Sequence, residues 1–332
     1  MAFFYDLFRL LGVFTFNRFF NIIALKWSYL ISRITGNIIH RGHPAYISIE
    51  PITTCNLKCP QCFITSKEFT RPKGEMVFTT FEKIISQASP WAFYLNLYFQ
   101  GEPFLNKNLI DFIAMAKQAN FYIAVSTNGH FMTEETTQLL IKSGLDRLIV
   151  SLDGTDAETY NKYRINGNFE TVVEGIKALA SGKKKNNKNH PFIELQFVVN
   201  KKNEPQIKEI KNLGKMLGVD KVTIKSLQLI NFEDASNWLP IKTSRYESDS
   251  EGVYKSKSKL PNNCSRMWNS CVVTWDGNII PCCFDKNACF IMGNIQIDLL
   301  QDIWRNSKYY NFRKKVFSER KSIDICSNCS ED

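Results

Sequence analysis

Three cysteines lie within eight residues near the start of the chain: Cys55, Cys59 and Cys62. Three thiolates on one loop can bind three of the four irons of a [4Fe–4S] cluster and leave the fourth iron open for another ligand. A structural zinc site would need a fourth ligand close by, and the next cysteine along the chain is Cys264. The triplet therefore favours a [4Fe–4S] cluster with an open iron over a zinc site or a disulfide.

The spacing Cys-x3-Cys-x2-Cys resembles the signature of the radical S-adenosylmethionine (SAM) superfamily. The resemblance implies an enzyme that cleaves SAM reductively at a [4Fe–4S] cluster. The resulting 5′-deoxyadenosyl radical would abstract hydrogen from an unactivated C–H bond, in the oxidation or maturation of a peptide, carbohydrate or lipid-linked substrate. Flavodoxin or ferredoxin would supply the electron. The chain departs from the family at Gln61, where an aromatic residue is usual, although Phe63 is aromatic.

The elements that would position these cysteines are short apolar runs that alternate with helical segments, a pattern typical of βα units in an α/β fold. Strands are predicted at 45–51, 93–99, 121–126, 146–151, 191–199 and 220–227. Helices are predicted near 79–89, 106–119, 133–143, 155–180 and 203–217. No Gly-x-Gly-x-x-Gly follows a strand, which argues against a Rossmann fold. Six units fit the partial barrel that the resemblance implies.

Polar residues follow three of the predicted strands at their carboxyl ends, where parallel α/β folds place their chemistry. They are Gly101-Glu102-Pro103, Thr127-Asn128-Gly129 and Asp153-Gly154. The cysteine triplet follows the first strand, so we expect all four groups on one rim.

The resemblance also implies cofactor-binding roles on this rim. Gly101 and Glu102 match the element that holds the SAM amine, through close backbone approach and a carboxylate acceptor. The other implied contacts are Ser126, Thr127 and Asn128 to the ribose and carboxylate, with Ser151 and Asp153 as weaker candidates. Arg164 resembles the arginine that pairs with the SAM carboxylate in relatives with an extra cluster domain. The alternative for Arg164 is an ordinary arginine on a helix surface.

The other seven cysteines form a second group near the end of the chain. Asp276-Gly277 between apolar residues predicts a hairpin, which would bring Cys264 and Cys282 together. The terminal pair, Cys326 and Cys329, would then close the site. Four thiolates can bind either zinc or a [4Fe–4S] cluster, and the spacing does not separate these two metals.

Residues 264–330 are similar to the SPASM domain, or its shorter twitch form, in the order of their motifs. These motifs are Cys, Trp, Asp-Gly, Pro-Cys-Cys, Gly-Asn, Ile-Trp and Cys-x2-Cys. The further cysteine series of a full SPASM domain is absent from the sequence. The resemblance therefore implies one auxiliary cluster, which we expect Cys264, Cys282, Cys326 and Cys329 to hold. Cys271 is the alternative for one of those places.

Two residues near these ligands are catalytic candidates. Cys283 adjoins an expected ligand and could donate a hydrogen atom or relay a proton. Asp285 is the rival, because sulfatase-maturating relatives use an acid beside a cluster-binding cysteine. A free cysteine is otherwise often a small buried apolar residue, and that interpretation stays open for Cys283 and Cys289.

Composition sets the wider limits. The chain has 332 residues and a formal charge of +10. Its ten cysteines fall in two separate groups, which favours metal sites in a reducing cytoplasm over disulfides. The basic run 183–188 lacks interleaved aromatic residues, so no nucleic-acid partner is expected.

The first 35 residues are dense in aromatic and aliphatic side chains. Charges interrupt them so often that no spanning helix is expected. They form either an interfacial helix on the inner face of a membrane, which hints at a lipid-linked substrate, or a helical hairpin packed on the core. The expected domains are 1–40 (apolar helical segment), 41–228 (barrel), 229–262 (linker or active-site loop) and 263–332 (cysteine-rich domain). The alternative function is a catalytically silent, membrane-docked iron–sulfur or zinc scaffold.

Overall fold

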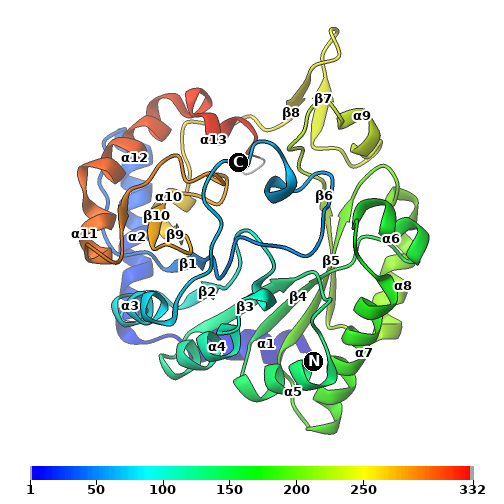
Figure 1. Cartoon of the computed structure of the whole chain (residues 1–332). Coiled ribbons are helices and arrows are strands. Elements are labelled where there is room, and N and C mark those ends of the chain that lie inside the picture. Colours follow the sequence, from blue (N-terminus) through cyan, green and yellow to red (C-terminus); the bar gives the residue numbers. More distant parts are fainter. Residues whose placement is uncertain (1, 330–332) are drawn as a thin grey trace.

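The computed structural model describes residues 2–329, and six parallel strands form its centre (Figure 1). They are β1 (Tyr46–Ile49), β2 (Tyr94–Asn96), β3 (Tyr122–Thr127), β4 (Arg147–Ser151), β5 (Phe192–Val199) and β6 (Lys221–Ser226). Each strand is hydrogen-bonded to the next in chain order. The predicted α/β fold with six parallel strands is therefore confirmed.

Helices cover the outer face of these strands, and β3 and β4 are buried on both faces over most of their length. The helices are α3 (Phe78–Ala88), α4 (Leu109–Gln118), α5 (Glu134–Ser143), α6 (Ala157–Tyr163), α7 (Phe169–Lys185) and α8 (Ile207–Leu217). Burial on both sides explains why β3 is apolar along most of its length: Tyr122, Ile123, Ala124 and Val125 are all buried.

The single helix predicted over 155–180 is wrong, because the chain breaks it into α6 and α7. Asn166 takes a positive φ of 66°, a left-handed conformation that ends a helix. A side chain at Gly167 would meet the carbonyl oxygen of Arg164 at 2.6 Å. The Asn168 side chain then accepts a hydrogen bond from the Thr171 N–H and begins α7. The break places Arg164 at the end of α6.

The C-terminal region adds three strands to the same sheet. They are β9 (Ser270–Val273), β10 (Asn278–Ile280) and β11 (Gly293–Asn294), and the sheet order is β11-β10-β9-β1-β2-β3-β4-β5-β6. The predicted hairpin is present as the antiparallel pair β9–β10, with Gly277 at a φ of 83° in its turn. β9 pairs in parallel with β1, so β1 is not an edge strand. The sequence did not indicate this pairing.

The remaining C-terminal elements are helices that pack around this hairpin. They are α10 (Arg266–Asn269), α11 (Leu300–Arg305), α12 (Ser307–Glu319) and α13 (Asp324–Ser327). Trp268 and Trp304 are fully buried among them. The predicted boundaries of the four domains stay a prediction, and the continuous sheet runs across the expected division between barrel and C-terminal domain.

The segment 229–262 is more regular than the predicted linker. It contains α9 (Ala235–Trp238) and the two-stranded pair β7 (Tyr246–Ser248) and β8 (Tyr254–Ser256). Tyr246 anchors this segment, since its hydroxyl donates to Asn328 at 2.5 Å and accepts from the Leu229 N–H at 3.0 Å.

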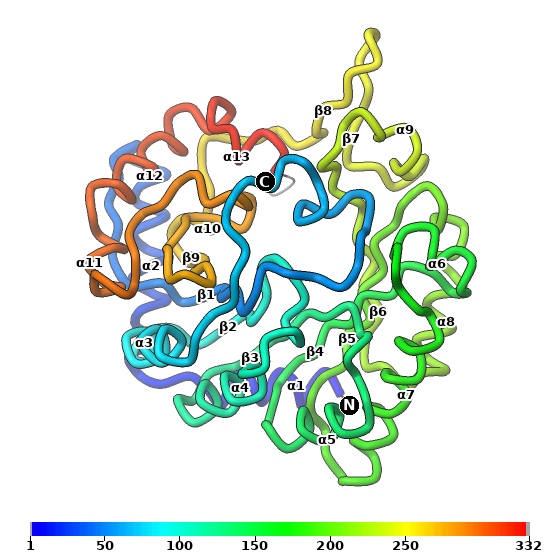
Figure 2. Tube along the Cα trace, viewed as in Figure 1, coloured from blue at the N-terminus to red at the C-terminus, as the bar shows by residue number. Residues whose placement is uncertain are grey.

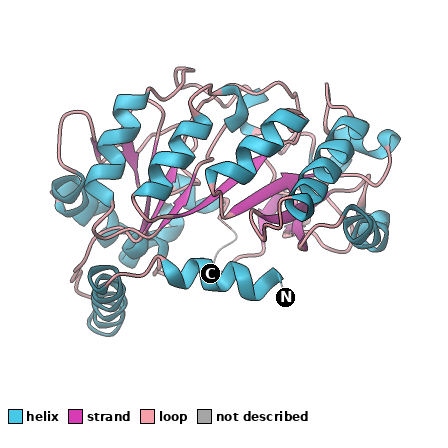
Figure 3. Cartoon of the chain, turned by 90° about the horizontal axis from the view of Figure 1, so that it is seen from below, coloured by secondary structure: helices cyan, strands magenta, loops and turns pink. Residues whose placement is uncertain are grey.

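Two helices, α1 (Ala2–Gly12) and α2 (Phe16–Thr35), precede the first strand. α1 lies against the starting ends of β3 and β4, and α2 packs its Tyr29 ring against Trp268 and Phe317 of the C-terminal region. α1, which carries the N label, runs along the outside of the molecule in Figure 3. Within the described residues, no single helix has both the length and the apolar character to cross a membrane, and only the pair α1–α2, bent by 94°, meets those criteria together.

Candidate functional site

The three N-terminal cysteines lie on the loop between β1 and α3. Figure 2 shows this loop, blue to cyan, crossing the side of the barrel between β1 and β6. Cys59 is buried in a cluster with Leu57 and Tyr163, and Cys55 and Cys62 are partly buried and pack against it. Burial raises the pKa of the Cys59 thiol to about 11, because a low-dielectric site disfavours the thiolate. A thiolate there needs a positive partner, which bound iron provides.

Polar donors surround these sulfurs. The Sγ of Cys55 accepts from the Leu57 N–H at 3.4 Å and from Nδ2 of Asn128 at 3.7 Å. The Sγ of Cys59 accepts from Nη1 of Arg164 at 3.8 Å. Hydrogen bonds to ligand sulfurs stabilise the negative charge of an iron–sulfur cluster. The residues at this loop therefore fit such a cluster.

Glu102 connects the ends of three strands. It is buried, and its Oε1 accepts from the Thr127 hydroxyl at 2.7 Å while its Oε2 accepts from the Asn128 N–H at 2.7 Å. The Glu102 N–H donates to the carbonyl of Thr54 at 2.8 Å, next to the first cysteine. Burial raises the pKa of this carboxyl to about 7. The observed contacts make Glu102 a residue that fixes the rim, in addition to any contact with SAM.

Gly101 makes this connection sterically possible. Its φ is 75°, and a Cβ at this position would lie 2.3 Å from the carbonyl oxygen of Ile52 and 2.8 Å from that of Thr54. Only glycine accommodates this approach without strain.

Asn128 links the cysteine loop to the next turn of the rim. Its Nδ2 donates to Oδ1 of Asn56 at 2.8 Å, and its Oδ1 lies 3.0 Å from Nδ1 of His130. The other ring nitrogen of His130 accepts from the Asn168 N–H at 2.8 Å. Sequence reasoning missed His130, whose only signal was its place two residues after Asn128.

Arg164 is not the surface arginine that the alternative interpretation proposed. Its Nε and Nη2 contact Oδ2 of Asp153 at 2.6 and 2.5 Å, and the Asp153 side chain is completely buried. Oδ1 of Asp153 accepts from the Val198 N–H at 2.7 Å. Asp153, which follows β4 and is bonded to β5, therefore holds the Arg164 guanidinium so that its remaining nitrogen, Nη1, faces the Sγ of Cys59.

The other predicted rim residues lie at the expected strand ends. Ser126 and Thr127 are the last residues of β3, and Ser151 is the last residue of β4.

Gln61, at the position where the family usually has an aromatic residue, is buried and forms hydrogen bonds to the backbone of residues 230–231. Its Oε1 accepts from both N–H groups there, at 2.9 and 3.0 Å, and its Nε2 donates to the carbonyl of Asn231 at 3.1 Å. Gln61 thus ties the cysteine loop to the segment after β6.

The four predicted ligands of the second group line one apolar cavity. Cys264, Cys282, Cys326 and Cys329 all border it. Arg320 donates to the Sγ of Cys329 at 3.5 Å and to the carbonyl of Asn263 at 2.8 Å, which adds positive charge beside the thiols. This donor set fits a cluster that carries negative charge.

Cys271, the alternative ligand, lies elsewhere. It is buried in β9 opposite Ile47 of β1 and does not border that cavity. Burial raises the pKa of its thiol to about 12. Its surroundings are those of a core residue.

The two predicted catalytic residues have different surroundings. The Sγ of Cys283 accepts from Nη1 of Arg266 at 3.5 Å, and Cys283 also interacts electrostatically with Tyr98 and Lys286. Asp285 is fully buried, and its two oxygens accept from the N–H groups of residues 289 and 290 at 2.7 and 2.9 Å. These contacts stabilise a turn, so the acid/base role of Asp285 stays a prediction.

A large cavity lies between the two cysteine groups, with a volume of ≈ 820 Å³. Its walls come from the cysteine loop (60, 63 and 65–68), the segment after β6 (228 and 230–233), the turn 284–289 and four C-terminal residues (324, 325, 327 and 328). None of the seven expected ligand cysteines borders it directly. Lys286, in the turn, places its Nζ 5.6 Å from the centre of the Phe63 ring and interacts electrostatically with both Cys62 and Cys283. Lys286 therefore lies between the two groups, and sequence reasoning missed it.

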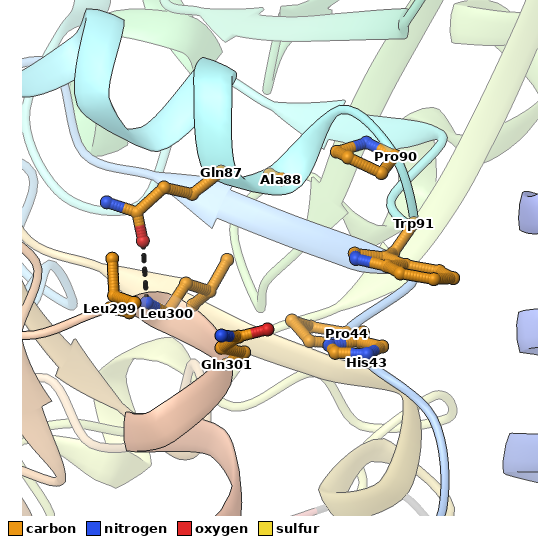
Figure 4. Close-up of a pocket in the computed structure, with 9 residues that line it drawn as sticks. All are labelled: His43, Pro44, Gln87, Ala88, Pro90, Trp91, Leu299, Leu300 and Gln301. Atoms are coloured by element: carbon orange, nitrogen blue, oxygen red, sulfur yellow. Dashed lines mark hydrogen bonds between the residues drawn. The ribbon is translucent and has the colours of Figure 1, made fainter.

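A smaller cavity of ≈ 230 Å³ lies at the other end of the strands (Figure 4). The rings of His43 and Trp91 stack there at 4.4 Å, and Oε1 of Gln87 accepts from the Leu300 N–H at 2.7 Å. It is bordered by none of the cysteines and none of the predicted site residues.

Among residues 2–329, no three His, Cys, Asp or Glu side chains are close enough together to hold one ion.

Comparison with known proteins gives two matches to family models. Residues 49–222 match the radical SAM superfamily, and residues 264–330 match SPASM, an iron–sulfur cluster-binding domain. The second match favours a cluster over zinc at the C-terminal site.

Two curated relatives and one solved structure resemble most of the chain. A tungsten-containing aldehyde ferredoxin oxidoreductase cofactor-modifying protein of Pyrococcus furiosus is 26% identical over 317 residues, covering 86% of this chain and 87% of its own length. An S-adenosyl-L-methionine-dependent 2-deoxy-scyllo-inosamine dehydrogenase of Niallia circulans is 27% identical, with coverage of 86% and 92%. The crystal structure of Streptococcus suis SuiB bound to S-adenosylmethionine aligns with a TM-score of 0.64 at 15% identity, covering 92% of this chain and 75% of SuiB. The structural likeness shows the shared fold.

Proposed function

The chain belongs to the radical SAM superfamily and carries a C-terminal SPASM domain, and from this premise we propose that it abstracts hydrogen from an unactivated C–H bond of a substrate held between its two cysteine groups. It is an enzyme that uses a [4Fe–4S] cluster, SAM and an auxiliary cluster. The observation that carries the proposal is the cavity of ≈ 820 Å³, whose walls include Phe63 beside the triplet and Ile325 beside the second group. A substrate in this cavity would be close to both clusters.

The residues of the triplet loop bind the first cluster in this proposal. Cys55, Cys59 and Cys62 are its ligands, and Asn128 and Arg164 donate to two of these sulfurs. When bound, the cluster supplies the electron that cleaves SAM to methionine and a 5′-deoxyadenosyl radical.

The chain's own residues bind and orient SAM. The backbone at residues 101–102 approaches the cysteine loop closely, and Glu102 keeps Thr127 and Asn128 in place beside it. Arg164 provides a fixed positive charge for the SAM carboxylate, and Asp153 sets its orientation. Ser126 and Ser151 lie at the neighbouring strand ends, where they can contact the ribose.

The auxiliary cluster has Cys264, Cys282, Cys326 and Cys329 as ligands in this proposal. Its role is to accept an electron from the substrate radical or to position the substrate. The names of the two relatives point to different substrates, since one is a cofactor-modifying protein and the other a 2-deoxy-scyllo-inosamine dehydrogenase. The substrate class in this proposal is therefore a peptide, a carbohydrate or a lipid-linked compound. None of the ten cysteines forms a disulfide, as expected of a chain in a reducing cytoplasm. An electron donor such as flavodoxin or ferredoxin is part of the proposal.

Transfer of deuterium from substrate to 5′-deoxyadenosine tests the proposal without knowledge of the substrate. The organism that encodes the chain is grown in deuterated medium, and its extract is separated by size into peptide and small-molecule fractions. Each fraction is incubated with the reconstituted enzyme, SAM and dithionite. We expect one fraction to give 5′-deoxyadenosine that is heavier by one deuterium, measured by mass spectrometry. Unlabelled 5′-deoxyadenosine from every fraction would contradict hydrogen abstraction from a C–H bond.

Replacement of Cys283 by alanine separates its role from that of the ligands. Because Cys283 lies near Lys286 but is not among the expected ligands, we expect Cys283→Ala to keep deuterium transfer to 5′-deoxyadenosine and to lose the mass change of the substrate. Cys271→Ala, which alters a thiol of β9 that does not border the proposed substrate cavity, is the control and should retain both. Normal product from Cys283→Ala would exclude a role as hydrogen or proton donor.

A further inference from the structure

The two N-terminal helices expose a large apolar surface. Half of the large apolar side chains that are exposed in the described part of the chain belong to α1 and α2. They are Phe3, Phe4, Tyr5, Leu7, Phe8, Leu11, Phe16, Phe19, Phe20, Trp27, Leu30, Ile31 and Ile34. We call this set the apolar face. Exposed apolar patches of this kind mark binding surfaces in water-soluble proteins.

Polar side chains, by contrast, hold α1 against the barrel. Asp6 is buried, accepts from the Tyr122 hydroxyl and forms an ion pair with Arg147. Arg9 contacts Asp146 at 2.6 Å and donates to a backbone carbonyl at 2.7 Å. The side of α1 that meets the protein therefore carries its charges.

α2 is attached in the same way. Arg18 is buried and donates to the backbone carbonyls of Val13 at 2.7 Å and of Ser89 at 2.8 Å. Asn21 donates to the carbonyl of His43 at 3.0 Å and accepts from its N–H at 2.8 Å. Most surface helices bury the apolar side and expose the polar side. In α1 and α2 the buried side chains are mostly polar, with Leu25 as the apolar exception, and most of the large apolar side chains are exposed. Their apolar side is therefore available to contact a membrane or another molecule.

The charges around the apolar face are positive. Residues 2–35 contain one acidic residue, Asp6, and it is buried. Lys26 and Arg33 are exposed on α2, beside Trp27 and Ile34 respectively.

A basic loop also adjoins α1. Tyr5 and Phe8 border one surface hollow together with Lys188 and His190, which follow α7. Lys184 and Lys185, at the end of α7, are exposed as well. An apolar helix face bordered by lysine and arginine is the composition that binds the surface of an anionic bilayer.

We propose that the apolar face of α1 and α2, with Lys184, Lys185 and Lys188 beside it, docks on the surface of a membrane that contains anionic phospholipid. The aromatic residues enter the boundary between head groups and acyl chains, and the lysines contact the lipid phosphates. The proposal does not depend on the reaction that the enzyme catalyses.

The fold fixes which end of the barrel would meet the membrane. α1 binds Tyr122 and Arg147, the first residues of β3 and β4, whereas the cysteine triplet follows the last residue of β1, at the other end of the strands. Figure 3 shows α1 outside the strands on that side. Docking therefore keeps the catalytic rim away from the bilayer, so the apolar face positions the enzyme and does not deliver acyl chains to the cavity.

Vesicle co-sedimentation tests the proposal. The probes are vesicles of equal parts phosphatidylglycerol and phosphatidylcholine, and vesicles of phosphatidylcholine alone. We expect the wild-type enzyme to bind the anionic vesicles and to bind the neutral ones at least about tenfold more weakly. Phe8→Ser/Phe16→Ser/Trp27→Ser should weaken binding to anionic vesicles at least about a hundredfold. Lys184→Glu/Lys185→Glu/Lys188→Glu should weaken it at least about tenfold.

The matched control is Met216→Ser/Ile241→Ser/Ile297→Ser, which removes three apolar side chains elsewhere on the surface that are at least as exposed as the three test residues. It should bind like the wild type, and all variants should form 5′-deoxyadenosine at the wild-type rate, which shows that they are folded. Failure of the wild type to bind anionic vesicles would overturn the proposal. If light scattering then shows a dimer that the Phe8→Ser/Phe16→Ser/Trp27→Ser variant loses, a second copy of the chain covers the face. Equal binding by this variant and the wild type would also overturn the proposal.

Discussion

Arg164→Met is expected to destabilise the protein by about 3–5 kcal/mol, because it leaves the buried Asp153 carboxylate without its charge partner. It should also abolish 5′-deoxyadenosine formation, since the positive charge beside Cys59 is lost. The measurements are thermal unfolding of the cluster-loaded protein and quantification of 5′-deoxyadenosine by chromatography.

Two controls separate the structural effect from the chemical one. Lys162→Met breaks an exposed ion pair with Glu158 on the same helix and should cost less than about 1 kcal/mol. The double variant Asp153→Asn/Arg164→Met removes both charges, so it should recover much of the stability but none of the activity. If the double variant recovers activity, Arg164 does not act on SAM or on the cluster.

Glu102→Gln is expected to lower the rate of 5′-deoxyadenosine formation at least about a hundredfold. Glutamine has the same shape, but its amide nitrogen cannot accept from the Phe104 N–H or from the Asn128 N–H, which each donate to one of the two carboxylate oxygens of Glu102. One of these donors is then unpaired, at a cost of about 1–3 kcal/mol, and Asn128 moves relative to Cys55. The measurement is the initial rate with saturating SAM and dithionite.

The control for this variant is Glu82→Gln, which changes an exposed carboxylate on α3 and should leave the rate unchanged. Iron content should stay at the wild-type level in Glu102→Gln, since no cysteine is altered. A normal rate at normal iron content would show that the links from Glu102 to Phe104 and Asn128 are not needed for SAM cleavage.

Local sequence signals were enough to predict the strands and the position of the rim. β3 and β4 are largely apolar runs between helical segments, and the burial of β3 on both faces explains that pattern. β1 and β6 instead alternate apolar and polar residues. Because parallel strands share one carboxyl edge, the triplet, Glu102 and Asn128 were expected together, and the structure places them within hydrogen-bonding distance.

Contacts between distant segments could not be predicted in this way. The pairing of β9 with β1 joins residues more than 200 positions apart, and neither strand's composition specifies its partner. The same holds for Gln61, whose bonds to the backbone of residues 230–231 depend on where the segment after β6 returns. For α1 and α2, the sequence shows one polar and one apolar side, but it does not show which side meets the barrel. Only the contacts of Asp6 and Arg18 decide this.

The central claim is that the two cysteine groups hold two clusters and that the first one drives SAM cleavage. Iron and sulfide counting after anaerobic reconstitution tests it most directly, combined with measurement of 5′-deoxyadenosine after addition of SAM and dithionite. We predict about eight irons in the wild type and in the control Cys271→Ala/Cys289→Ala. Cys55→Ala/Cys59→Ala/Cys62→Ala should retain about four irons and form no 5′-deoxyadenosine. An iron-replete wild type that forms no 5′-deoxyadenosine would contradict the account and favour a catalytically silent scaffold.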